Sequence, residues 1–182
     1  MGKKPLTTRD MSRIALMAVV LSVCSWISVP APVPFTMQTF AVFCALGLLG
    51  GRRGSLAVLL YILLGAVGLP VFSGFQGGVG KLLGPTGGYI LGFLLAALLY
   101  RLLERWAERS LARTACTLLL GLAVCYAFGT VWFVTVYARG GSPIGYLAAL
   151  GLCVYPFILP DLIKLALALL LIRSLKKYVR FA

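Results

Sequence analysis

Apolar residues in this chain gather into six runs, separated by short segments that are basic or rich in glycine and proline. The runs cover residues 11–29, 35–50, 55–72, 87–103, 114–137 and 146–172. A helix needs about 20 apolar residues to cross the hydrocarbon core of a membrane, and four of the runs approach or exceed that length. The pattern therefore predicts an all-α integral membrane protein: a single six-transmembrane-helix bundle over residues 1–182, with no second domain.

The composition supports this prediction. The chain is 61% hydrophobic and 12% charged, with a mean hydropathy of +1.01, whereas about a quarter of the residues of a soluble domain are charged. The net charge of +13 would suit a nucleic-acid partner, but the basic residues form short clusters between apolar runs, without a basic groove of interleaved aromatic residues. We therefore expect membrane lipids, and no nucleic acid, around the protein.

The basic residues also predict an orientation, because cytoplasmic loops of membrane proteins carry an excess of Lys and Arg. With the N-terminus inside, fourteen of the 17 basic residues fall on the cytoplasmic side, including Lys3, Lys4, Lys177 and Arg180. Only Lys81 and Arg139 fall on the outer side, and Lys164 lies within the last run. We therefore expect both termini in the cytoplasm.

Asp161 and Lys164 stand inside the last apolar run, and Asp161 is the only acidic residue within a predicted span. Ionisable residues at bilayer depth are costly and usually face a partner or a polar cavity. Their i, i+3 spacing places them on one face of a helix, where they can pair. A salt bridge that only links helices and a ligand site both remain possible, and we favour the ligand site.

Two loops on the expected outer side have unusual composition. Residues 29–39 hold three prolines and end in polar side chains, which predicts a stiff, extended cover. Residues 72–89 are rich in glycine yet contain Phe75, Val79 and Leu82. Irregular backbone near a membrane is tolerated where it lines a cavity or is buried in protein. We expect both loops to fold over a ligand cavity.

Motifs for catalysis and metal binding are absent from the sequence. It contains no histidine and no phosphate-binding loop. The five cysteines lie in or near apolar runs without a CxxC pair, and we interpret them as packing residues. We therefore expect no enzyme activity, no metal site and no cofactor.

Three motifs resemble the BioY family, the biotin-binding S components of energy-coupling-factor (ECF) vitamin transporters. They are PVPFTMQT at residues 32–39, GPTGGY at 84–89 and PFILPDLIK at 156–164. The resemblance runs over nearly the whole chain, with the motifs in the family's order. It implies a multi-pass protein of a prokaryotic cell membrane that captures biotin on the outer face. It also implies a transmembrane T subunit and two cytoplasmic ATPase subunits as partners.

The same resemblance implies a set of ligand residues: Asp161, Lys164, Thr36, Gln38, Gly84, Thr86, Gly87 and Tyr89. A second set of candidates comprises Phe35, Ser73, Phe75, Gln76 and Tyr155. A carboxylate such as Asp161 can accept hydrogen bonds from the ureido N–H groups of biotin, and Lys164 can donate either to the ureido carbonyl or to the tail carboxylate.

S components often carry alanines four residues apart in the first span, as a docking surface for the T subunit. In this chain Ala15 is followed by Val19, whereas Ala18 and Ser22 keep a small-xxx-small spacing.

Three alternative functions remain open at this point. The first is an S component for another vitamin, of the thiamine or riboflavin class. The second is a stand-alone proton-coupled small-molecule carrier that uses Asp161 as its proton site, although the sequence lacks the inverted repeat found in many such carriers. The third is a purely structural membrane subunit.

Overall fold

The computed structural model describes residues 6–30, 33–141 and 144–179, with side chains described as far as residue 176. The expectations that concern Lys3, Lys4, Pro32, Arg180 and the side chain of Lys177 lie outside these residues. The described part contains seven helices and two short strands. These are α1 (Thr8–Trp26), β1 (Ser28–Val29), β2 (Phe35–Thr36), α2 (Gln38–Ala66), α3 (Val79–Leu83), α4 (Gly87–Ala107), α5 (Leu111–Arg139), α6 (Tyr146–Cys153) and α7 (Tyr155–Val179).

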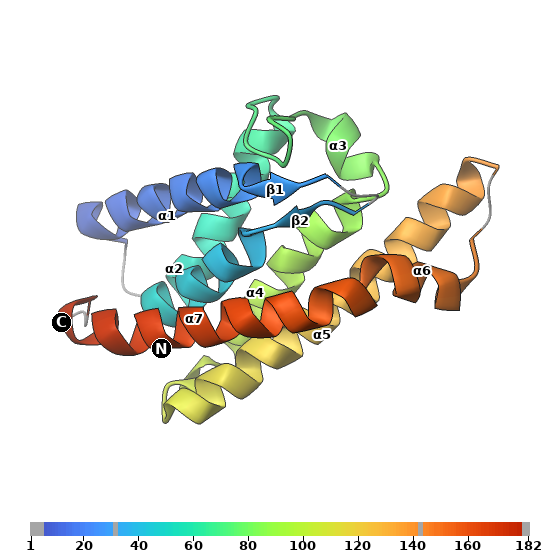
Figure 1. The fold of residues 1–182 in the computed structure, drawn as a ribbon. Helices are drawn as coiled ribbons and strands as arrows, with labels where there is room; N and C mark the ends of the chain where they lie inside the picture. Colours follow the sequence, from blue (N-terminus) through green and yellow to red (C-terminus); the bar gives the residue numbers. More distant parts are fainter. Residues whose placement is uncertain (1–5, 31–32, 142–143, 180–182) are drawn as a thin grey trace.

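The helices form one bundle in which α2 contacts α1, α4 and α7, while α4 packs along α5. Two ends of the bundle can be distinguished (Figure 1). One end holds the strands β1 and β2, the short helix α3, the end of α5 and the start of α6, and we call it the ribbon end. The start of α1, the middle of α2, the turn between α4 and α5 and the end of α7 lie at the other, which we call the charged end.

Helix α2 contains a sharp bend at Gly50, whose φ of 78° and ψ of 174° are not helical. Beyond the bend the chain doubles back, so that a Cβ atom on Gly54 would lie 2.9 Å from the carbonyl oxygen of Ala45. Glycine suits both positions, since it accepts a positive φ and allows close backbone approach. The bend therefore separates two arms, residues 38–49 and 51–66. The sequence pattern leaves residues 51–54 as a linker between two apolar runs, but these residues are helical and the reversal occurs one residue earlier, at Gly50.

The sequence predicted one helix for the last apolar run, but the structure divides this run into two helices. It divides into α6 and α7 at Val154, which has φ −124° and ψ −57°. Pro156 explains the division, because it has no N–H to donate to the preceding turn. Hydropathy gave no sign of the break, since both sides of it are apolar.

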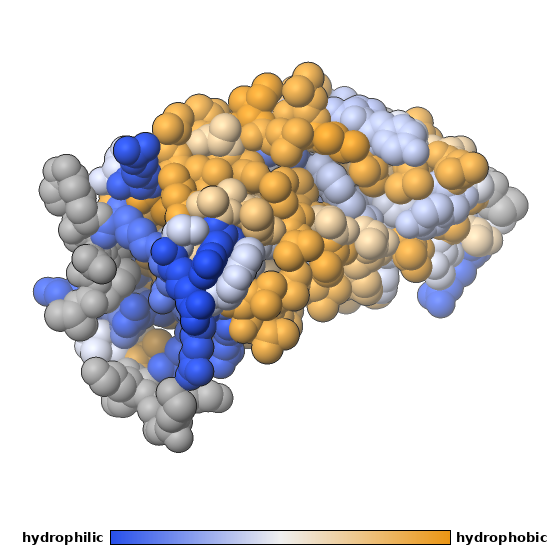
Figure 2. All heavy atoms as spheres, turned by 90° about the horizontal axis from the view of Figure 1, so that it is seen from below, coloured by the Kyte–Doolittle hydropathy of each residue, from blue (hydrophilic) through white to orange (hydrophobic). Residues whose placement is uncertain are grey.

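Within the described part of the chain, four helices are long and apolar enough to cross a membrane: Gln38–Ala66, Gly87–Ala107, Leu111–Arg139 and Tyr155–Lys176. Helix α1, with 19 residues, carries Arg9, Asp10 and Arg13 near its start. Apolar side chains cover most of the face seen in Figure 2, and hydrophilic residues gather toward one end. The chain is thus a mostly helical membrane protein, as predicted.

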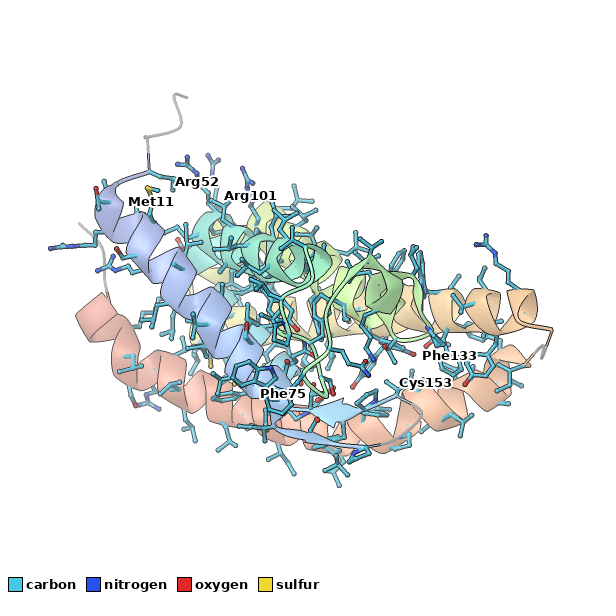
Figure 3. All side chains as sticks on the ribbon, turned by 90° about the horizontal axis from the view of Figure 1, so that it is seen from above. Met11, Arg52, Phe75, Arg101, Phe133 and Cys153 are labelled. Carbon is cyan, nitrogen blue, oxygen red and sulfur yellow. The ribbon has the colours of Figure 1, made fainter. Side chains whose placement is uncertain are left out.

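The two unusual loops lie side by side at the ribbon end. Strands β1 and β2 pair antiparallel, with Ser28 opposite Thr36. The glycine-rich segment contains α3. The two residues just before this segment are held by the end of α1: Ser25 Oγ donates to the Val71 carbonyl (2.5 Å), and Trp26 Nε1 donates to the Pro70 carbonyl (2.8 Å). The Trp26 and Phe75 rings also stack (5.1 Å between centroids), and Figure 3 shows Phe75 beside the end of α1.

Candidate ligand-binding site

A cavity lies beneath these two loops. Its empty volume is about 640 Å³, counting the part that opens to the surroundings. Its lining comes from both loops and from α2, α4, α5, α6 and α7. The lining residues are Val33, Pro34, Thr36, Gln38, Thr39, Ser73, Lys81, Thr86, Tyr89, Ile90, Phe93, Cys125, Tyr126, Cys153, Phe157, Asp161 and Lys164.

Asp161 and Lys164 form an ion pair at the base of this lining. One helical turn of α7 separates them, and Lys164 Nζ lies 2.7 Å from Asp161 Oδ1. Both residues are buried, with exposed fractions of 2% for Asp161 and 4% for Lys164. Two buried charges are tolerable only where they pair and their remaining hydrogen-bonding capacity is used. The surroundings of the pair meet this requirement.

Polar groups from three other segments complete the hydrogen bonding of the pair. Thr39 Oγ1 donates to Asp161 Oδ1 (2.8 Å), and Tyr126 Oη donates to Asp161 Oδ2 (2.5 Å). Lys164 Nζ donates to the Thr36 carbonyl (2.7 Å) and lies within 3.2 Å of Thr39 Oγ1. The same nitrogen sits 4.0 Å from the centroid of the Phe35 ring, a distance at which a cation is attracted to an aromatic face.

This arrangement uses the two charges unequally. An ammonium has three donors, and Lys164 has three oxygen acceptors around it. An ionised carboxylate has about four acceptor positions, whereas Asp161 receives hydrogen bonds from three groups. Lys164 is therefore saturated, while Asp161 can still accept a hydrogen bond from a ligand.

Several predicted site residues lie together in the cavity wall. Thr36, Gln38, Ser73, Thr86 and Tyr89 all line it. The Gln38 backbone N–H donates to Thr36 Oγ1 (3.2 Å), and its side-chain amide donates to the Tyr61 hydroxyl. The Tyr89 hydroxyl is hydrogen-bonded to Thr130 Oγ1 (3.1 Å). Neighbours within the protein thus fix the orientations of the Thr36, Gln38 and Tyr89 side chains.

Other predicted residues lie elsewhere. Phe75 and Tyr155 are exposed, at 64% and 59%, and do not line the cavity. Gln76 and Gly84 line a second hollow, which shares Lys81 and Thr86 with the cavity.

Two further candidates, Phe35 and Gly87, do not line the cavity. Phe35 contacts Lys164 and also packs against Phe157, with ring centroids 6.0 Å apart. Gly87 has a packing role, because a Cβ atom there would lie 1.7 Å from the Leu82 carbonyl oxygen.

Sequence reasoning missed several residues of the cavity. Thr39 lies within the first motif, where the predicted candidates were Phe35, Thr36 and Gln38. Tyr126 lies in the middle of an apolar run, where a phenol is a signal for a buried hydrogen bond. In the sequence, Lys81 stood out only as one of two basic residues expected on the outer side. No group of histidine, cysteine or acidic residues that could hold a metal ion occurs among residues 6–30, 33–141 and 144–179.

Comparisons with known proteins agree on one family. The model of the BioY family matches residues 1–181. The biotin transporter BioY of Thermotoga maritima is 41% identical over 173 residues, which cover 93% of this chain and 96% of the relative. The probable biotin transporter BioY of Pyrococcus horikoshii is 40% identical over 172 residues, which cover 94% and 98%.

A solved structure shares the fold. The 2.1 Å crystal structure of the S-component for biotin from an ECF-type ABC transporter superposes with a TM-score of 0.82 and 26% sequence identity, and the match covers 95% of each chain. The resemblance seen in the three sequence motifs is thereby confirmed over the full length. The chain belongs to the BioY family.

Proposed function

We propose that this protein is the biotin-binding S component of an ATP-driven ECF-type vitamin importer, and that it captures biotin from the outer face of the cell membrane. Its family membership supports the substrate class, since relatives that match over nearly their full length are named biotin transporters. The observation that carries the proposal is the buried Asp161–Lys164 pair, which faces a cavity enclosed by two loops.

The chemistry of the cavity suits biotin. Its ureido group offers two N–H donors and one carbonyl acceptor, and Asp161 retains acceptor capacity for such a donor. Thr36, Gln38 and Ser73 place further polar groups around the lining, whereas Ile90, Phe93 and Phe157 supply apolar wall for the thioether ring and the acyl chain. A few polar groups within an apolar wall are typical of small-molecule sites.

The proposed topology has six membrane-spanning segments with both termini in the cytoplasm. The segments are α1, the two arms of α2, α4, α5 and α7. The positive-inside rule supports it, because Arg52, Arg101 and Arg109 belong to the charged end, and Figure 3 shows Arg52 and Arg101 together there. The ribbon end then faces outward, with Arg139 and Lys81.

Two arginines at opposite ends of α5 test this topology. Arg109 and Arg139 are both exposed, so Arg109→Cys and Arg139→Cys form a matched pair, made in a Cys116→Ser background because Cys116 is the exposed native cysteine. In intact cells an impermeant maleimide should label the cysteine at position 139 and not the one at 109. The reverse pattern would overturn the orientation.

The proposed partners are a transmembrane T subunit and two cytoplasmic ATPase subunits, and we assign no catalytic step to this chain. The Ala18 and Ser22 face of α1 is unsuitable for docking, because both residues are buried, at 1% and 5%, within the chain itself. The exposed face of α1 instead carries Met11, Leu16 and Val19. Because we assign no catalytic step to this chain, transport should require the added subunits.

Calorimetry of the detergent-purified protein is the direct test. Titration with biotin should give saturable one-to-one binding, and titrations with thiamine and riboflavin should give none. Binding of another vitamin with higher affinity than biotin would overturn the substrate assignment. Biotin uptake by the pure protein in liposomes, driven by a proton gradient alone, would support a proton-coupled carrier instead.

A further inference from the structure

Lys81 differs from the other two charged residues that line the cavity because it has no partner within the described part of the chain. It lies in α3, is half-buried and lines both the cavity and the adjoining hollow. Within the described part of the chain its ammonium makes no hydrogen bond and no ion pair. Of the four acidic residues in the chain, only Asp161 lines the cavity, and it is paired with Lys164.

The cavity therefore has an excess positive charge. Asp161 and Lys164 neutralise each other at a separation of 2.7 Å, which leaves the Lys81 charge uncompensated. An ammonium that loses water without gaining a counter-ion is destabilised. In agreement, partial burial lowers the pKa of Lys81 below its usual range. An anionic group of a ligand would relieve this cost at Lys81.

Lys164 is poorly suited to receive that anion. Its three donors are already directed to the Thr36 carbonyl, Thr39 Oγ1 and Asp161 Oδ1. A ligand carboxylate at Lys164 would have to displace one of these acceptors and would also approach the negative charge of Asp161. Like charges in one site repel each other. The two lysines are thus distinguished by what already surrounds them.

We propose that Lys81 binds the carboxylate at the end of the ligand's acyl tail, and so makes the site select the free acid over neutral derivatives. The inference rests on the proposed function, because it takes biotin as the ligand. It assigns the ureido end to the Asp161–Lys164 pair and the acidic end to α3. The tail then points toward the hollow lined by Gly77, Gly80 and Gly84. Glycine has no side chain, so the backbone is accessible there.

Matched ligands and matched variants test the assignment. The affinities of biotin and of neutral biotinamide are measured for the wild type, Lys81→Ala and Lys81→Arg. Arg139→Ala serves as control, since Arg139 is the other basic residue on the same side and does not line the cavity. The Lys81→Ala variant loses one charge-assisted hydrogen bond to the carboxylate. It should therefore bind biotin about tenfold to a hundredfold more weakly than the wild type.

Binding of biotinamide by the same variant should stay at the wild-type level, which also shows that the variant is folded. Lys81→Arg should keep most of the preference for the acid, and Arg139→Ala should change neither affinity. Equal weakening of both ligands in Lys81→Ala, or of neither, would overturn the role of Lys81 while leaving biotin binding intact. A wild type that binds neither ligand would instead refute the proposed function.

Discussion

An ion pair between an acidic and a basic side chain lies at the charged end and another lies at the ribbon end, and the two pairs are built differently. At the charged end, Arg53 Nε lies 2.8 Å from Asp10 Oδ1, and the Arg53 side chain is 29% exposed. At the ribbon end, Lys164 and Asp161 lie 2.7 Å apart, with side chains only 5% and 2% exposed. The separations are nearly equal, so the difference lies in the surroundings.

Those surroundings indicate different roles. Asp10 also caps α1, because its carboxylate accepts from the Thr7 backbone N–H (3.2 Å) and its own N–H donates to Thr7 Oγ1. That pair joins α1 to α2 and is only partly shielded, because the Arg53 side chain is 29% exposed while that of Asp10 is 8% exposed. Ion pairs that water can reach contribute less than fully buried ones. Asp161 instead collects hydroxyl groups from α2 and α5 at a cavity wall. Because an unpaired polar group in a buried, low-dielectric position is costly, each of its partners is necessary.

Breaking the buried pair should have the largest effect. Asp161→Asn or Lys164→Ala leaves one buried charge without its partner, which should cost about 3–5 kcal/mol of stability. Asp161→Asn also removes a charged contact to the ligand, which costs about 2–5 kcal/mol, so the dissociation constant of biotin should rise roughly thirtyfold to several thousandfold. Lys164→Ala should weaken binding indirectly, because it leaves Asp161 without its partner. Melting temperature and calorimetric affinity measure the two effects separately.

A double variant separates a ligand role from a purely structural one. Replacing both charges by apolar residues of similar size, as in Asp161→Leu with Lys164→Met, should recover much of the stability. Binding should remain lost, because neither group can contact the ligand. A well-folded variant of either residue that binds biotin normally would leave the pair with a structural role only.

Removing the hydroxyl groups around Asp161 should have an intermediate effect. Tyr126→Phe and Thr39→Val each delete one hydrogen bond to the carboxylate and keep the shape of the side chain. Such bonds to a charged group contribute about 1.5–3 kcal/mol, which should appear as a lower melting temperature. Tyr89→Phe is the matched control for Tyr126→Phe, because the Tyr89 hydroxyl is hydrogen-bonded to a neutral group, Thr130 Oγ1. Its removal should therefore cost less.

The pair at the charged end should show the smallest effect. Asp10→Asn removes the charge but keeps an oxygen that can cap the helix. We expect a slight fall in melting temperature and a biotin affinity within about twofold of the wild type, since an ion pair whose arginine reaches solvent contributes little. An affinity loss as large as that of Asp161→Asn would show that the two ends are coupled and that the two ion pairs do not have separate roles.

The sequence predicted the helical membrane class because apolar runs and basic clusters report on lipid and water directly. It did not locate the bend of α2, since glycines at positions 50, 51 and 54 offer several places for a break. It also missed the division between α6 and α7, although Pro156 was a usable signal. Periodicity and hydropathy describe each segment alone and carry little information on how a segment is interrupted.

The candidate site was predictable to a similar extent. Asp161 and Lys164 stood out because charge is rare in an apolar run, and the structure places both in the cavity wall. Their partners could not be inferred in that way. Thr39 is 122 positions from Asp161, and Tyr126 is 35 positions from it. Only the packing of α2, α5 and α7 brings these side chains together.

The bend at Gly50 has a consequence for how the protein enters its membrane. Under the proposed topology, the arm of residues 38–49 is about 18 Å long at 1.5 Å per residue, well short of the roughly 30 Å of hydrocarbon. A segment of that length is a poor substrate for insertion by itself. We therefore expect the insertion machinery to accept the two arms together as a helical hairpin, held by the Gly51 N–H that donates to Glu104 Oε1 (2.6 Å) once α4 has followed.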